Sequence, residues 1–291
     1  MKRAAITSLT GPLVLLLLSS CQVWAQDREF KEQISKEFTL PPEAGRHTLA
    51  IYNIDGAVTV QGYAGNKVML EVTKTIRARD AQTLELGKRE AQLGFLQRND
   101  SVVAYLKEPF DSRPNRNHRD NDHRIDYHYT FEYVVKVPYP MNLHVSTINN
   151  GAVLVQDVTG TLKAHNINGP VTLRNVRGTT TARTINGNVE ATYAANPPGP
   201  SSYYTINGQI KVTYPADFSA DVHFKSMHGE LFTDFPGAEI LPAQVTQNKQ
   251  STGRGTQYKI TKDTAVRLGK GGKDFRFETL NGDVTIKQQP Q

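Results

Sequence analysis

The chain has 291 residues, with 34 lysines and arginines against 28 aspartates and glutamates, so its formal net charge is +6. This mild excess is too small to indicate a nucleic-acid-binding protein. The single cysteine excludes an intramolecular disulfide, so burial and hydrogen bonding must hold the fold together.

The first 25 residues have the pattern of an export signal. Lys2 and Arg3 give it a positive start, and the apolar core over residues 13–18 is too short to span a bilayer, which takes roughly 20 apolar residues. Two cleavage points fit this pattern. Cleavage before Cys21, which we favour, produces a lipoprotein anchored to the membrane by lipid on that cysteine, whereas cleavage after Ala25 produces a soluble protein. Both predict export to the bacterial cell envelope, as an outer-membrane lipoprotein or in the periplasm.

Residues 26–290 are predicted to form one domain. Asp80 can cap a short helix over residues 81–93, although Gly87 is unfavourable inside it. Residues 111–128 are polar and charged, which predicts an exposed loop. Strand patterns rich in Val, Ile and Thr precede the repeats described below, over residues 48–60, 67–76, 101–106 and 129–137.

The loop over residues 111–128 contains the best metal-ligand candidates, which are His118, Asp120, Asp122, His123, Asp126 and His128. The histidines are spaced by five residues, a spacing that matches no compact zinc motif. Arg116, Arg119 and Arg124 lie between the candidates and oppose cation binding. We therefore expect a solvated loop, and no metal or cofactor.

A short phrase occurs seven times: a hydrophobic residue, Asn or a related residue, Gly, any residue, and a second hydrophobic residue. Its glycines are Gly56, Gly151, Gly169, Gly187, Gly208, Gly229 and Gly282. We expect each glycine to occupy a structural turn with positive φ. The asparagines are expected to stabilise these turns through their side chains rather than to bind a ligand.

Between Gly151 and Gly187, glycines recur every nine residues and corners of the same type recur every 18. Apolar and polar residues alternate between the glycines, as in strands with one buried face. Two strands and two corners per 18 residues predict an all-β, single-domain β-solenoid in which equivalent strands stack in parallel. The alternative is an antiparallel β-meander or sandwich, because Asn-Gly also favours hairpin turns.

The repeated phrase Thr-Ile-Asn-Gly-x-Val behind an export signal resembles a bacterial β-strand-repeat domain family known as "putative adhesin". The resemblance extends over residues 45–288 and is carried by residues 147–151, 184–189, 205–210 and 279–284. It implies a β-solenoid-like fold on the bacterial envelope and implies no catalytic activity.

We expect a non-enzymatic, adhesin-like protein that presents a polar surface for adhesion or for binding an envelope protein or glycan. One alternative is a polysaccharide-acting enzyme on a β-helix scaffold, which needs clustered carboxylates beside a basic residue. Only scattered acids, such as Asp157 and Glu190, occupy the exposed positions. Another alternative is an accessory partner of an envelope signalling system.

Exposed strand positions in the repeats carry basic and hydroxyl side chains that form a candidate surface for an acidic glycan. These residues are Lys163, His165, Thr172, Arg174, Thr181 and Arg183. They also suit an ordinary soluble surface without apolar patches, which is the interpretation that we favour from the sequence.

Overall fold

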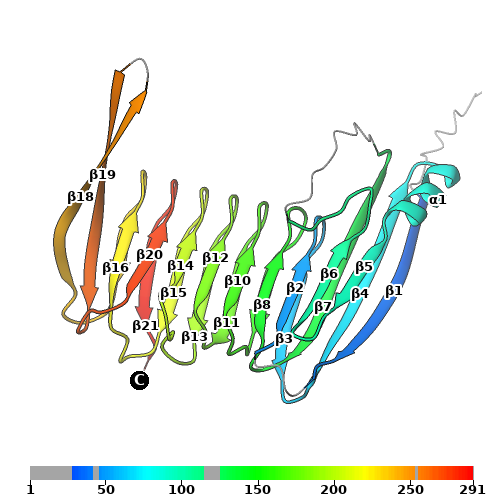
Figure 1. Ribbon diagram of the computed structural model, residues 1–291, viewed down its shortest axis with the longest axis horizontal. Helices are drawn as coiled ribbons and strands as arrows, with labels where there is room; N and C mark the ends of the chain where they lie inside the picture. Colours follow the sequence, from blue (N-terminus) through cyan, green and yellow to red (C-terminus); the bar gives the residue numbers. More distant parts are fainter. Residues whose placement is uncertain (1–27, 42–45, 115–124, 253–254, 291) are drawn as a thin grey trace, which may run out of the picture.

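The computed structural model describes residues 28–41, 46–114, 125–252 and 255–290. Within these residues the chain forms 21 strands in two sheets and one short helix (Figure 1). The all-β prediction is confirmed. Residue 21 and most of the candidate metal loop lie outside the described residues.

The two sheets run the length of the molecule, and their inner faces enclose one hydrophobic core. Sheet A has the spatial order β1 (Arg28–Thr39), β4 (Lys67–Ala78), β7 (Tyr127–Pro138), β3 (Val58–Tyr63), β9 (Val153–Gln156), β11 (Val171–Val176), β13 (Val189–Tyr193), β15 (Ile210–Tyr214), β21 (Val284–Gln288) and β17 (Leu231–Thr233). Sheet B has the order β18 (Glu239–Thr252), β19 (Gly255–Leu268), β16 (Ala220–Lys225), β20 (Asp274–Glu278), β14 (Ser202–Tyr204), β12 (Thr180–Arg183), β10 (Leu162–His165), β8 (Asn142–Ser146), β2 (Thr48–Tyr52), β6 (Ser101–Leu106) and β5 (Leu93–Gln97).

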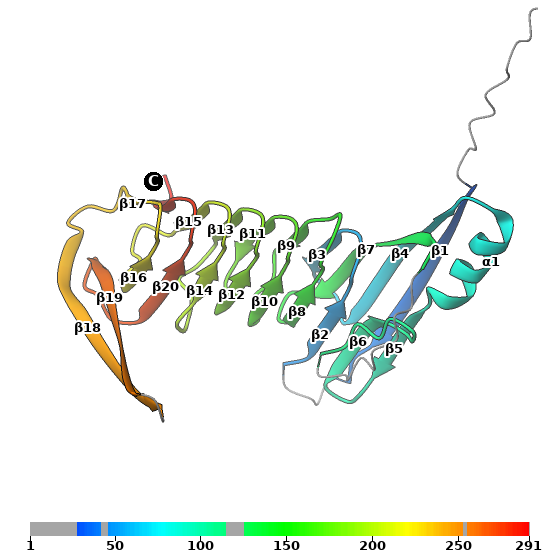
Figure 2. The ribbon, with the colours of Figure 1, turned by 90° about the horizontal axis from the view of Figure 1, so that it is seen from above.

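In the repeat block, from β8 to β15, the chain passes from one sheet to the other at every corner. Each strand therefore pairs in parallel with the strand two positions away in the sequence, and not with its immediate successor as in a meander. The register follows the predicted period, since Leu162 pairs with Thr180 and Val171 pairs with Val189. Figure 2 shows the resulting two-strand units, here called coils, in a row along the long axis.

The alternation of apolar and polar residues decides which side chains enter the core. On β8, Leu143 and Val145 are buried, while the intervening His144 faces outward. The same alternation holds on the neighbouring strands, so the Val, Leu and Ala positions of successive coils stack on one another between the sheets. The polar positions consequently form rows on the outer faces of the two sheets.

The N-terminal end of the molecule is built differently from the repeats. Sheet A is widened there by β1, β4 and β7, which pair antiparallel, and α1 (Ala81–Glu90) packs on these three strands. Asp80 caps the helix as predicted, with its carboxylate accepting from the backbone N–H of Thr83 at 2.8 Å. The helix ends three residues earlier than predicted because Leu93 begins β5. Gly87 is buried, and a β-carbon there would lie 2.8 Å from Ile76 and 2.9 Å from Tyr127.

At the C-terminal end, the order of the coils departs from the order of the sequence. After β15 the chain forms β16 and β17, then the antiparallel hairpin of β18 and β19, and only then returns as β20 and β21. The last coil is inserted, because β20 pairs with both β14 and β16 and β21 pairs with both β15 and β17. Gly282 therefore lies inside the stack and not at its end, contrary to the sequence order.

Candidate binding surface

The Asn-Gly corners line up along one edge of the stack and form a ladder of side-chain amides. The ladder contains Asn281, Asn207, Asn186, Asn168 and Asn149, in this order. Each of the first four donates from Nδ2 to Oδ1 of the next asparagine, in the adjacent coil, at 2.8–2.9 Å. At the far end, His228 Nδ1 lies 3.2 Å from Asn281 Oδ1. These bonds join the corners of successive coils, which gives the asparagines a structural role.

The threonine of the repeated phrase has a structural role that the sequence analysis did not assign. Buried Thr184 donates its hydroxyl proton to the carbonyl oxygen of Gly169 in the preceding coil at 2.8 Å, and Thr205 does the same to Gly187 at 2.8 Å. In the coil where Asn166 stands in place of this threonine, its side-chain amide donates to the carbonyl oxygen of Gly151 at 2.9 Å. The buried carbonyls at the corners therefore have partners.

Glycine is required at most corners because the backbone of the neighbouring coil lies very close, and less because of the backbone angles of the glycine itself. Gly56 and Gly282 have φ of 112° and 149°, but the other five predicted turn glycines are absent from the positive-φ residues of the described chain. At Gly187, a β-carbon would lie 2.4 Å from the carbonyl oxygen of Gly169. The expectation of a positive φ at every corner was wrong for these five positions.

The outer face of sheet B carries two continuous rows of polar and aromatic side chains. The first row, in order across the strands, consists of His144, Lys163, Thr181, Ser202, Arg276 and His223. The second consists of Tyr52, Ser146, His165, Arg183, Tyr204, Glu278 and Lys225. We call these two rows together the sheet B strip.

The six residues considered above as a glycan surface do not share one face. Lys163, His165, Thr181 and Arg183 belong to the sheet B strip, whereas Thr172 and Arg174 lie on β11 in sheet A, on the opposite side of the molecule. A corner separates them in the sequence, and each corner changes the sheet. The aromatic members of the strip, Tyr52 and Tyr204, were missed because they lie outside the regular 18-residue block.

Two histidines in the strip are packed tightly between neighbours. Tyr52 Oη lies 3.2 Å from His144 Nδ1, and the rings of His144 and His165 meet edge to face with centroids 5.6 Å apart. Burial lowers the pKa of His165 to about 4, with smaller contributions from His144, Arg183 and Lys163. Burial also lowers the pKa of His144, and the charge of Lys163 adds to this effect. Burial therefore favours the neutral form of both histidines.

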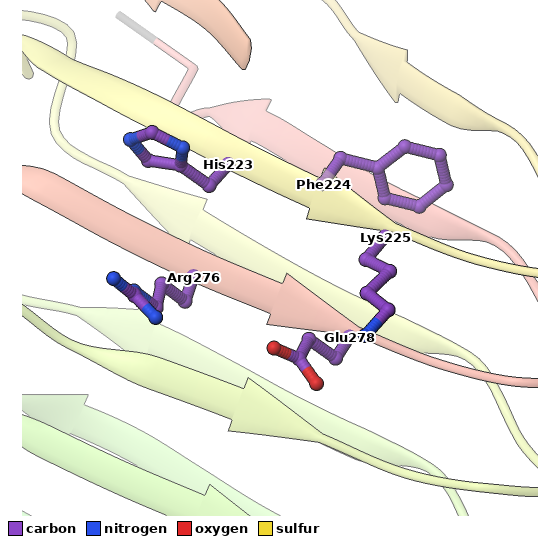
Figure 3. A pocket seen from close by; sticks show the side chains of 5 residues that line it. All are labelled: His223, Phe224, Lys225, Arg276 and Glu278. Carbon is purple, nitrogen blue, oxygen red and sulfur yellow. The ribbon is translucent and has the colours of Figure 1, made fainter. Parts of the chain in front are cut away.

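A shallow hollow lies at the C-terminal end of the strip, lined by His223, Phe224, Lys225, Arg276 and Glu278 (Figure 3). Its volume is about 20 Å³, and it opens to solvent. Small-molecule sites commonly enclose roughly 300–1,000 Å³ and cover most of their ligand. This hollow is a depression in an extended surface and does not have the shape of an enclosed active site.

One pair of carboxylates near the hollow bears on the enzyme alternative. Asp221 and Asp274 lie opposite each other on β16 and β20. Arg267 donates to both oxygens of Asp221, at 2.8 and 3.2 Å, and this bonding lowers the pKa of Asp221. His223 Nε2 lies 3.1 Å from Asp274 Oδ1. Glycoside hydrolysis requires one carboxyl group that keeps its proton near neutral pH, and Asp221 is shifted in the opposite direction.

Most of the other predicted site residues cannot be placed. Within the described part of the loop, His128 Nε2 lies 3.9 Å from Asp55 Oδ2, and no group of three or more potential metal ligands is found among the described residues. Cys21 and residues 115–124 lie outside those residues. Of the scattered acids, Asp157 accepts a hydrogen bond from Asn175, and Glu190 projects from the outer face of sheet A. In the described chain, no helix has the length and apolar character needed to cross a membrane.

No protein-family model matches the chain, and no curated protein matches it. Three solved structures are similar over most of their length. A "putative cell adhesion protein" from Clostridium sporogenes has 11% identity and a TM-score of 0.39 over 91% of this chain and 100% of its own. A "putative adhesin" from Bacteroides fragilis has 9% identity and a TM-score of 0.38 over 89% and 97%. A "putative lipid binding protein" from Parabacteroides distasonis has 9% identity and a TM-score of 0.33 over 89% and 97%.

Proposed function

We propose that this protein is a non-enzymatic, adhesin-like lipoprotein of the bacterial cell envelope. Its body is a flattened β-solenoid with two strands per coil, which presents a polar surface to another envelope component. The observation that carries this proposal is the sheet B strip, whose polar and aromatic side chains continue across seven strands. A continuous face of this kind suits a large or extended partner, whereas catalysis on a small substrate calls for a deep cleft.

The binding function is tested with the domain that begins at residue 26 and with isolated bacterial envelopes. We expect saturable binding, measured as labelled protein that sediments with the envelopes and is displaced by unlabelled protein. The supernatant is analysed for sugar fragments in the same experiment. Absence of saturable binding would contradict the proposal, and steady release of fragments would establish the enzyme alternative instead.

The anchor is tested separately by fractionating cells that produce the full chain. With lipid on Cys21, the mature protein should sediment with membranes and keep Trp24, the one tryptophan of the sequence. Two or more acyl chains anchor a protein stably, since each buried CH₂ adds about 0.8 kcal/mol. Cys21→Ser should move the protein to the soluble fraction. A wild-type protein that is soluble, starts at Gln26 and lacks tryptophan fluorescence would rule out the lipoprotein.

A further inference from the structure

The sheet B strip contains three positive side chains without an ion pair in the described chain, on β10, β12 and β20. Lys163, Arg183 and Arg276 are exposed, and none of them forms an ion pair with the described residues. The acid of the two rows is Glu278, which is on the same strand as Arg276. Opposite charges face each other on both sheets, since Glu278 lies opposite Lys225 on sheet B and Glu190 lies opposite Lys211 on sheet A. Two further acids on the outer face of sheet B, Asp221 and Asp274, bond to Arg267 and His223. The charge pattern therefore favours an anionic ligand on sheet B.

Aromatic rings lie among these charges and are held in place by their neighbours. The guanidinium of Arg183 lies 4.9 Å from the ring centroid of Tyr204, and the rings of Tyr52 and His144 meet at 5.2 Å between centroids. Tyrosine side chains offer an apolar ring and a polar hydroxyl at little cost in conformational entropy. Rings beside cations suit a ligand with both an apolar surface and negative charge, as in the sugar rings of an acidic glycan.

The length of the strip indicates an extended ligand. The strip crosses the seven strands from β2 to β16, which corresponds to six strand spacings of about 4.8 Å, or roughly 29 Å. Membrane binding would also require large apolar side chains that can insert between lipids. None of the exposed large apolar residues of the described chain, such as Val134, Ile185 and Leu280, belongs to the strip.

We propose that the sheet B strip binds an extended acidic polysaccharide, which lies across the strands from β2 to β16. This inference rests on the proposed envelope-binding function and assigns its ligand class. Lys163, Arg183 and Arg276 contact the acidic groups, and Tyr52 and Tyr204 contact the faces of the sugar rings.

The test uses polygalacturonate as the probe and two matched triple variants of the domain. One variant, Lys163→Gln with Arg183→Gln and Arg276→Gln, removes three charges from sheet B. The control, Arg174→Gln with Lys211→Gln and Lys287→Gln, removes three exposed charges from sheet A strands of the same stack. Both variants have the same net charge, and all six side chains are exposed, so both should keep the wild-type melting temperature.

We expect wild-type protein to bind polygalacturonate at low salt, and the sheet B variant to bind about tenfold more weakly or worse, because three surface charge contacts are lost. The sheet A variant should remain within about twofold of wild type. Tyr204→Ala should also weaken binding, and uncharged dextran should bind far more weakly than polygalacturonate. Equal losses in the two triple variants would overturn the assignment, because they would show an effect of net charge alone.

Two further probes separate other anionic partners from polysaccharide. Duplex DNA and phosphatidylglycerol vesicles should bind more weakly than polygalacturonate at the same salt concentration. Tighter binding of either probe through the sheet B residues would overturn the proposal in favour of that partner. If polygalacturonate fails to bind while isolated envelopes still bind the domain, the ligand class is wrong and the envelope-binding function stands. If neither polygalacturonate nor the envelopes bind, both proposals are wrong.

Discussion

At Gly187, the carbonyl oxygen of Gly169 occupies the space in which any other residue would place its β-carbon, 2.4 Å away. The same oxygen accepts the hydroxyl proton of buried Thr184. This one carbonyl group therefore explains why the repeated phrase has both a threonine and a glycine. The threonine supplies its hydrogen bond, and the glycine allows the neighbouring backbone to come this close.

Gly187→Ala should destabilise the protein by about 3 kcal/mol, because the new β-carbon meets backbone atoms that can move only if two coils separate. Gly237→Ala is the matched control. Gly237 has φ of 68° but no heavy atom lies within 4 Å of an added β-carbon, so the cost there should be about 1–2 kcal/mol of backbone strain. Urea unfolding of both variants measures the difference. Similar losses at the two positions would contradict the close-approach explanation.

His165 should make the stability of the protein sensitive to mildly acidic pH. Burial lowers its pKa to about 4 in the folded state, whereas an unfolded histidine has a pKa near 6.5. Between these values the unfolded chain binds more protons, so stability is lost as the pH falls from about 6.5 towards 4. His165→Gln should lose less stability than wild type between pH 7 and pH 5, as measured by urea unfolding. An equal loss in both proteins would show that His165 does not contribute.

The sequence predicted the role of a single residue only where that role depends on residues adjacent in the sequence. The capping role of Asp80 and the turn positions of the Asn-Gly corners were predictable, because both depend on adjacent residues. The reason for glycine at Gly187 was not predictable, because it lies in another coil. The face on which Arg174 lies was also missed, since assigning it requires knowing that each corner changes the sheet.

Among the elements, the hairpin of β18 and β19 is the one most independent of the rest. β19 pairs with β16 only over Thr264–Leu268, and beyond these residues the two hairpin strands pair only with each other (Figure 1). The polar sequence over residues 243–257 gave no strand pattern, because it lacks the alternation of apolar and polar residues from which a strand is predicted. β1 was missed for a similar reason, since it is an edge strand with charged residues on both faces.

Shortening this hairpin should leave the stability of the stack unchanged. Deleting residues 247–250 and 257–260 removes four cross-strand pairs and keeps the register of the rest. We expect the melting temperature to change by less than about 2 °C, since a change of 1 kcal/mol corresponds to roughly 2–4 °C in a protein of this size. Deletion of residues 273–291, which removes β20 and β21, is the comparison and should prevent folding. A large loss from the shortened hairpin would show that it supports the body.

At the scale of the whole molecule, the fold is a stack whose ends are built from other kinds of structure. α1 and the broad antiparallel strands occupy one end, and β18 and β19 occupy the other. Stacks of similar units need such ends, because a regular terminal coil would leave an open sheet edge and an exposed core. The sequence predicted the repeating middle through its period, but neither end has a period from which it could be derived.

The insertion of β20 and β21 between coils made earlier in the chain has a consequence for folding during synthesis. A chain that stops before residue 274 leaves β14 and β15 without partners on one side and β16 and β17 without partners on the other. The unpaired N–H and C=O groups of both strand edges make such a chain prone to aggregation and proteolysis. Only a chain that includes β20 and β21 can close the gap, so a shorter chain cannot form the continuous stack.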